Sequence, residues 1–187
     1  MRRIAFSSSI AAALTAAALF GASTPLAKAL LRDLSPVLLA GLLYLGSGVG
    51  LGLIRVARDR GWRTPPMAGK EWFWLSLAIV FGGVLGPLAL MLGLTRTTAA
   101  TASLLLNLEA VLTALLAWIV FRENADRRIV LDMLLIVAGA VLLALPGSSQ
   151  GAHLGWGALL IVGACLCWAL DNNFTRKVSA SDALFIA

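Results

Sequence analysis

Six long apolar runs, separated by short polar connections, follow one another along the chain. They cover residues 4–24, 36–54, 72–94, 99–121, 129–145 and 154–174. Crossing about 30 Å of hydrocarbon takes about 20 helical residues at about 1.5 Å each, and these runs have that order of length. Strands of a transmembrane barrel would alternate apolar and polar residues, whereas these runs are continuous. The pattern therefore predicts six transmembrane α-helices.

The composition of the chain agrees with a lipid environment. Hydrophobic residues make up 60% of it and its mean hydropathy is +0.92, whereas soluble domains are about 45 to 50% apolar. The longest connection, residues 55–71, is too short to fold as a soluble domain. We therefore predict an all-α, polytopic helical bundle whose function lies within the membrane.

Lysine and arginine collect in every second connection between the runs. Twelve of the fifteen lie on one predicted side of the bilayer and three on the other. The larger set is Arg2, Arg3, Arg55, Arg58, Arg60, Arg63, Lys70, Arg122, Arg127, Arg128, Arg176 and Lys177, and the smaller is Lys28, Arg32 and Arg96. Short basic loops stay cytoplasmic, so we expect an inner-membrane protein with a cytoplasmic N-terminus. The net charge of +6 is thus a topological signal and predicts no nucleic-acid partner.

A single acidic residue, Glu109, falls near the midpoint of the fourth run. A charge at that depth costs at least about 2.5 to 3.5 kcal/mol, so Glu109 should face the protein interior, be protonated or find a partner. Thr113, one turn on, shares its face, while Asn107 falls on a different face of an ideal helix. Glu109 could carry a proton or hold a cationic or zwitterionic solute; alternatively, it is a neutral packing residue bonded to another helix.

A second polar cluster, Asp171, Asn172 and Asn173, lies late in the sixth run. Its position near the cytoplasmic end favours lining the mouth of a cavity or capping the helix over binding a solute. We nevertheless include Asp171 and Asn172 among the candidate cavity residues.

Glycine and proline shape the predicted bundle. Gly46 with Gly50 and Gly48 with Gly52 are small-residue pairs that predict close packing of the second helix. In the third run, Pro87 removes an amide and clashes with the carbonyl of Gly83, so that helix should bend there. Such a bend suits either a cavity wall or simple packing. We expect Pro25 to end the first helix.

Residues suited to enzymatic or metal chemistry are sparse. Cys165 and Cys167 stand two apart and share no helix face, and His153 has no partner at metal-ligand spacing. Glu109 has no second acid, histidine or reactive serine at its depth. We therefore predict a protein that is not an enzyme and has no cofactor.

A charge-free cluster of turn formers, residues 146–151, is the clearest linker in the chain. Residues 168–173 can be laid against residues 20–25, although the similarity is weak. A repeat of five helices must enter the membrane from opposite sides in its two copies. We therefore expect residues 1–147 to form a first five-helix repeat, and residues 148–187 to form a linker and the first helix of a second, inverted one.

The fourth run carries the most specific family resemblance. Residues 107–118, NLEAVLTALLAW, followed by Phe121 and Glu123, resemble the fourth helix of EamA-like proteins in the drug/metabolite transporter superfamily. Residues 86–90, GPLAL, and the exit from Gly93 towards Ala99 are similar to the connection that precedes it. The resemblance covers about residues 14–177.

This resemblance implies ten helices in two inverted repeats around a central cavity, and export or exchange of small metabolites, amino acids or drugs. The candidates for substrate binding or proton coupling are Glu109, Asn107, Thr113, Gly83, Pro87, Asp171 and Asn172. The expected partners are the lipid bilayer, a small-molecule substrate, and a second copy or a missing second half.

Two other functions remain open. One is a non-transporting membrane subunit that assembles through its glycine faces. The other is a nucleotide-sugar or sugar-phosphate carrier, which the absence of Lys or Arg from the middle of any run disfavours.

Overall fold

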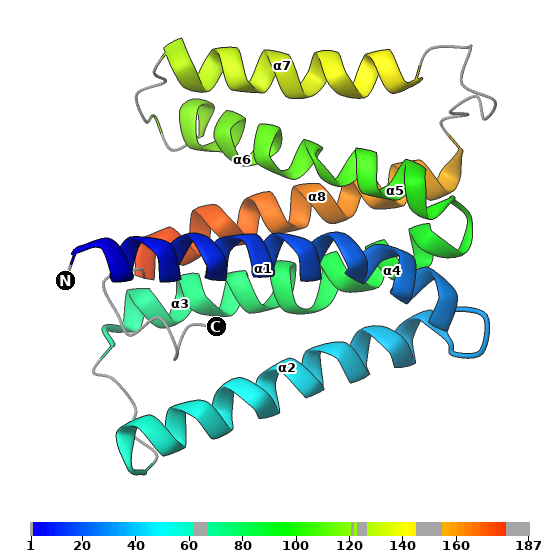
Figure 1. The fold of residues 1–187 in the computed structure, drawn as a ribbon. Helices are drawn as coiled ribbons and strands as arrows, with labels where there is room; N and C mark the ends of the chain where they lie inside the picture. Colours follow the sequence, from blue (N-terminus) through cyan, green and yellow to red (C-terminus); the bar gives the residue numbers. More distant parts are fainter. Residues whose placement is uncertain (1, 62–66, 121, 123–126, 145–154, 179–187) are drawn as a thin grey trace.

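The structure is a computed structural model that describes residues 2–61, 67–120, 122, 127–144 and 155–178. All regular elements within these ranges are helices (Figure 1). In chain order they are α1 (Arg2–Leu30), α2 (Pro36–Asp59), α3 (Gly69–Ala78), η1 (Ile79–Leu85), α4 (Gly86–Thr95), α5 (Ala99–Leu106), α6 (Leu108–Ile119), α7 (Arg127–Ala144), α8 (Trp156–Thr175) and η2 (Arg176–Val178).

The predicted polytopic helical fold is confirmed. Within the described residues, five spans are long and apolar enough to cross a membrane: Ile10–Leu30, Pro36–Asp59, Gly69–Thr95, Ala99–Ile119 and Trp156–Val178. The fifth run forms α7, which contains a shorter apolar stretch, Val130–Gly139. The third span is built from α3, η1 and α4 and the fourth from α5 and α6, so two of the six predicted helices are interrupted.

The third span bends where the sequence predicts it. Residues Ile79–Leu85 form a π-helical segment, in which the amide of Gly86 donates to the carbonyl of Phe81, five residues earlier. Pro87 follows at the start of α4. A proline that cannot continue the ladder is a usual cause of such an irregular turn.

The prediction that Pro25 ends the first helix is wrong. Pro25 lies inside α1, which continues to Leu30. In a lipid environment a chain that left the helix here would expose several unpaired backbone groups, whereas staying helical sacrifices one hydrogen bond. The continued helix is therefore the less costly arrangement.

The central helix of the bundle is α8. It contacts α3, η1, α4, α5 and α6, whereas α7 packs on α6, α2 on α4, and α1 on α5 and α4 (Figure 1). Ile161, Ala164 and Cys165 of α8 are completely buried, together with Leu94 of α4 and Ala102 of α5. Cys165 is thus a small core residue, as its sequence context suggests.

Small residues let α8 approach the third span closely. An ideal Cβ on Gly93 would lie 2.6 Å from Cγ1 of Ile161, and one on Gly86 would lie 2.9 Å from Nε1 of Trp168. In contrast, Gly46, Gly48, Gly50 and Gly52 of α2 have no atom within 4 Å of their ideal Cβ positions. Close packing of the α2 glycines is therefore not seen within the described part of the chain.

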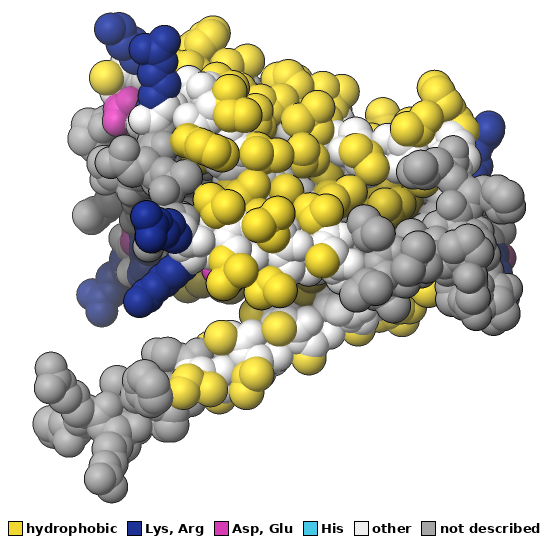
Figure 2. Space-filling model, turned by 90° about the horizontal axis from the view of Figure 1, so that it is seen from above, with side chains coloured by type: hydrophobic (Ala, Val, Ile, Leu, Met, Phe, Trp, Pro, Cys, Tyr) yellow, Lys and Arg dark blue, Asp and Glu magenta, His cyan; other side chains and the backbone are white. Residues whose placement is uncertain are grey.

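Charged side chains gather at the two ends of the bundle, with apolar side chains between them (Figure 2). Arg58 at the end of α2 and Arg127 at the start of α7 lie at one end, and Lys28, Arg32 and Arg96 lie at the other. Lys28 donates to the carbonyl of Leu94 in the last turn of α4, where a cation complements the helix dipole. This arrangement is that of a multi-pass membrane protein in contact with lipid.

Candidate substrate cavity

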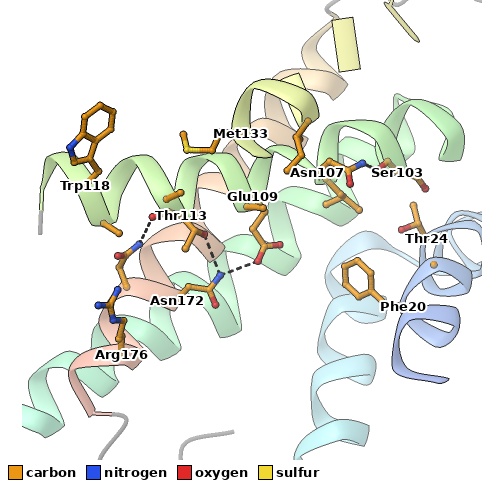
Figure 3. A pocket seen from close by; sticks show the side chains of 17 residues that line it. Phe20, Thr24, Ser103, Asn107, Glu109, Thr113, Trp118, Met133, Asn172 and Arg176 are labelled. Atoms are coloured by element: carbon orange, nitrogen blue, oxygen red, sulfur yellow. Dashed lines mark hydrogen bonds between the residues drawn. The ribbon is translucent and has the colours of Figure 1, made fainter. Parts of the chain in front are cut away.

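A cavity of about 860 Å³ opens between the first span and the helices around Glu109 (Figure 3). Its lining comes from α1, α5, α6, α7, α8 and η2. The lining residues are Phe20, Gly21, Thr24, Ser103, Leu106, Asn107, Glu109, Ala110, Thr113, Ala114, Ala117, Trp118, Met133, Ile136, Asn172, Asn173 and Arg176. The volume is in the range of pockets that hold small organic molecules.

Glu109 and Asn172 form the polar centre of this cavity. The amide nitrogen Nδ2 of Asn172 donates to Oε1 of Glu109 over 3.1 Å and lies 3.4 Å from the hydroxyl of Thr113 (Figure 3). Glu109 and Thr113 are one turn apart on α6, so one face of the helix presents both. The structure thus joins the two polar clusters of the sequence, which come from the fourth and sixth runs.

Asn173 ties α8 to α6 beside this pair. Its Nδ2 donates to the carbonyl of Thr113 over 3.2 Å and to that of Ala169 over 2.8 Å, and its side chain is buried. A buried amide with both protons bonded fixes the rotation of α8 about its axis. Asn172, the next residue, is held towards Glu109 as a result.

Asn107 also lines the cavity. It lies where the fourth span is interrupted, between the end of α5 and the start of α6, and its backbone stays in the right-handed helical region. The side chain of Asn107 donates to the carbonyls of Ser103 and Leu104, each over 3.1 Å. Asn107 and Glu109 therefore border the same cavity, whose lining wraps around this span.

Three sequence candidates, Gly83, Pro87 and Asp171, do not line the cavity. Gly83 and Pro87 belong to the bent third span. Asp171 lies against Gly82 and accepts a hydrogen bond from the hydroxyl of Thr175 over 3.0 Å. The position of Asp171 on α8 therefore directs it to the third span, while Asn172 faces the cavity.

Several lining residues were missed by sequence reasoning. Phe20 and Thr24 come from α1, Met133 from α7 and Arg176 from η2 (Figure 3). Arg176 has a signal, since it follows the polar cluster by one turn. Phe20 and Met133 have none, because an apolar residue in a membrane helix looks the same whether it faces lipid or a cavity.

Among the described residues, the lining combines one carboxyl group, six side-chain amide or hydroxyl groups, the guanidinium of Arg176 and an otherwise apolar surface. Such a surface can hold an amino group or a proton at Glu109 and an amphipathic body beside it. Within the described residues, no group of three or more His, Cys, Asp or Glu side chains could hold a metal ion.

Comparison with known proteins gives a family and several relatives. Residues 7–145 match the EamA-like transporter family. An uncharacterized transporter of Methanothermobacter thermautotrophicus is 30% identical over 188 residues, which cover 93% of this chain and 55% of that protein. The uncharacterized transporter YetK of Bacillus subtilis is 27% identical over 174 residues, 91% of this chain and 51% of YetK.

A shorter relative matches almost along its whole length. A Pseudomonas aeruginosa protein described as a "Probable 4-amino-4-deoxy-L-arabinose-phosphoundecaprenol flippase subunit ArnE" is 37% identical over 110 residues, 59% of this chain and 91% of that protein. The chain spans about half the length of the two uncharacterized transporters. No solved structure matches it significantly.

Proposed function

The chain belongs to the EamA-like transporter family, and on this premise we propose that it exports small metabolites, amino acids or drugs by secondary-active transport. The observation that carries the proposal is the cavity in which Glu109 meets Asn172 across two spans. A membrane protein that places a carboxyl group in a solute-sized cavity has a group that can bind a cationic substrate or a coupling ion there.

We infer that Glu109 is the coupling group. Its carboxyl can hold either a proton or the amino group of a substrate, and two such cations would exclude one another from a single acid. Asn172 and Thr113 supply neutral partners within reach of that acid, and Asn107 adds an amide to the same cavity. Exchange of a proton for a substrate at Glu109 would then drive export.

Alternating access requires two halves that rock about the cavity. We propose that residues 1–147 form the first repeat and that residues 148–187 begin the second, inverted one. Four further helices, carried by a longer chain or by a second polypeptide, would complete the wall. The chain length, about half that of two relatives, is consistent with this inference.

The basic residues support an orientation with the N-terminus in the cytoplasm of a bacterial-type cell and the protein in its inner membrane. Single cysteines introduced by Arg58→Cys and Arg96→Cys, with Cys165 and Cys167 replaced by serine, test this. A membrane-impermeant maleimide should label position 96 in intact cells and position 58 only after permeabilisation. The reverse pattern would contradict the orientation.

Export is tested in cells that produce the protein, by efflux of a panel of labelled amino acids and toxic analogues with and without a proton gradient. Glu109→Gln keeps the size of the side chain and removes the titratable group, so gradient-driven efflux should be lost. Asp132→Asn is the matched control, because Asp132 is exposed on α7 outside the cavity lining. Unchanged gradient dependence in Glu109→Gln would exclude coupling through this residue.

A second candidate is a subunit of a two-chain flippase or another assembly, in which this chain alone transports nothing. It is favoured by the similarity to the ArnE protein, which is described as a flippase subunit. Efflux that requires a co-produced second membrane protein, and co-purification of the two, would support this reading over an autonomous carrier. A carrier of sugar phosphates is less well supported, since among the described residues that line the cavity Arg176 is the only basic one.

A further inference from the structure

The π-helical turn of the third span leaves one carbonyl without its helical donor. In the π-helical register an amide bonds the carbonyl five residues earlier, as the amide of Gly86 bonds that of Phe81. The next pair in this register joins residue 87 to the carbonyl of Gly82, but residue 87 is proline and has no N–H. The carbonyl left without a backbone donor is therefore that of Gly82. In an α-helical register, residue 87 would instead bond the carbonyl of Gly83, so the proline would leave that one unbonded.

Two side chains from different spans supply that carbonyl with donors. The hydroxyl of Tyr44 in α2 donates to it over 3.1 Å, and Nε1 of Trp168 in α8 donates over 3.2 Å. A carbonyl oxygen has two lone pairs, so it can accept both bonds at once. Gly82 is buried, and in an apolar surrounding an unbonded carbonyl would be costly.

The glycines of the third span make room for this arrangement. An added Cβ on Gly86 would meet the indole of Trp168 at 2.9 Å, and one on Gly82 would overlap the carboxyl group of Asp171. Trp168 and Asn172 are one turn apart on α8, so the residue that holds the third span and the residue that bonds Glu109 lie on the same helix segment.

We propose that Tyr44 and Trp168 together replace the amide that Pro87 removes, and that this shared carbonyl is a hinge between α8 and the third span. Because two helices bond one acceptor, α8 can separate from the third span while the Tyr44 bond keeps the carbonyl of Gly82 satisfied. The opening of α8 then costs less than it would if Trp168 were the sole donor. This proposal does not depend on the identity of the transported substrate.

The shared carbonyl is tested by thermal unfolding of the purified protein in detergent. Tyr44→Phe and Trp168→Phe each remove one donor and leave the other, so each should lower the midpoint by about 2 °C. The double variant leaves the carbonyl unbonded and should lower it by about 8 °C, more than the sum. Trp156→Phe, a change of an exposed tryptophan on the same helix, is the control and should have no effect.

Pro87→Ala provides the decisive comparison. It restores the amide that can bond the carbonyl of Gly82, so it should recover at least half of the fall in midpoint seen in the double variant. If that fall came from the space left by the missing indole, the restored amide would not recover it. If the double variant does not fold, recovery of folding on adding Pro87→Ala supports the same conclusion. Additive single effects, or no recovery with Pro87→Ala, would overturn the shared-carbonyl proposal.

The hinge itself is tested by the reactivity of Cys165, which is completely buried in α8. In a Cys167→Ser background, labelling by N-ethylmaleimide reports how often α8 leaves its neighbours. Trp168→Phe should speed labelling about tenfold, because it removes the bond that opening must break, while Tyr44→Phe makes Trp168 the sole donor and should slow labelling about fivefold. Labelling of Tyr44→Phe at or above the parent rate would overturn the hinge. Equal labelling rates in the two variants would show that α8 is not held through Trp168.

Discussion

The crossing of α4 and α8 allows a steric prediction that can be worked out atom by atom. In Gly93→Ala the new methyl group would lie 2.6 Å from Cγ1 of Ile161, 2.9 Å from the carbonyl oxygen of Gly157 and 3.3 Å from the amide nitrogen of Ile161. Two of these three atoms are backbone atoms, and Ile161 is completely buried. The neighbours therefore cannot yield by turning a flexible side chain, and the two helices must move apart.

Overpacking of this kind costs about 1 to 3 kcal/mol. For a chain of this size each kcal/mol lowers the unfolding midpoint by about 2 to 4 °C. Taking the middle of the range, Gly93→Ala should lower the midpoint by about 4 to 8 °C.

The assay is thermal unfolding in detergent, followed by the loss of helical circular dichroism. Gly48→Ala is the matched control, because an added Cβ at Gly48 meets no atom within 4 Å and alanine is the better helix former. Equal midpoints for Gly93→Ala and Gly48→Ala would refute the close crossing of α4 and α8.

Three further changes follow from the structure. Ile161→Ala should lower the free energy of unfolding by about 2 kcal/mol, as measured by denaturant titration in detergent. This is the low end for core truncations, because the lipid around a membrane protein is as apolar as its core. A loss smaller than that of truncating the exposed Leu159 to alanine would contradict the packing. Ser35→Ala removes the side chain that accepts from the amide of Leu38 at the start of α2, so it should cost about 1 kcal/mol in the same titration, and Ser35→Asp should restore it. Asn172→Ala should reduce efflux about tenfold by removing the donor to Glu109, and efflux at the parent rate would show that this bond has no part in transport.

The sequence was a good guide where one physical term dominates. Continuous apolar runs located the spans, and Pro87 located the irregular turn, because hydrocarbon penalises every polar or unpaired group strongly. The same rule singled out Glu109 as the acid that must face the interior, and the structure places it in a cavity.

Sequence reasoning failed where two distant segments must be placed side by side. It treated Asp171 and Asn172 as equivalent neighbours, although α8 turns Asn172 to Glu109 and Asp171 to Gly82. It also did not foresee the break between α5 and α6 at Asn107, because an ideal helical period assumes a continuous helix. Whether the repeat boundary at residue 147 is correct stays a prediction.

Three features of the chain follow from transfer free energies that act residue by residue: that it crosses a membrane several times, which runs become helices, and which acid is out of place in lipid. The central position of α8, the bond from Asn172 to Glu109, and the carbonyl of Gly82 shared by Tyr44 and Trp168 are known only from the packed structure. These contacts depend on how each helix is rotated and how closely it approaches its neighbours. In membrane helices that are apolar all round, the shapes of the packed side chains determine both, and hydropathy does not.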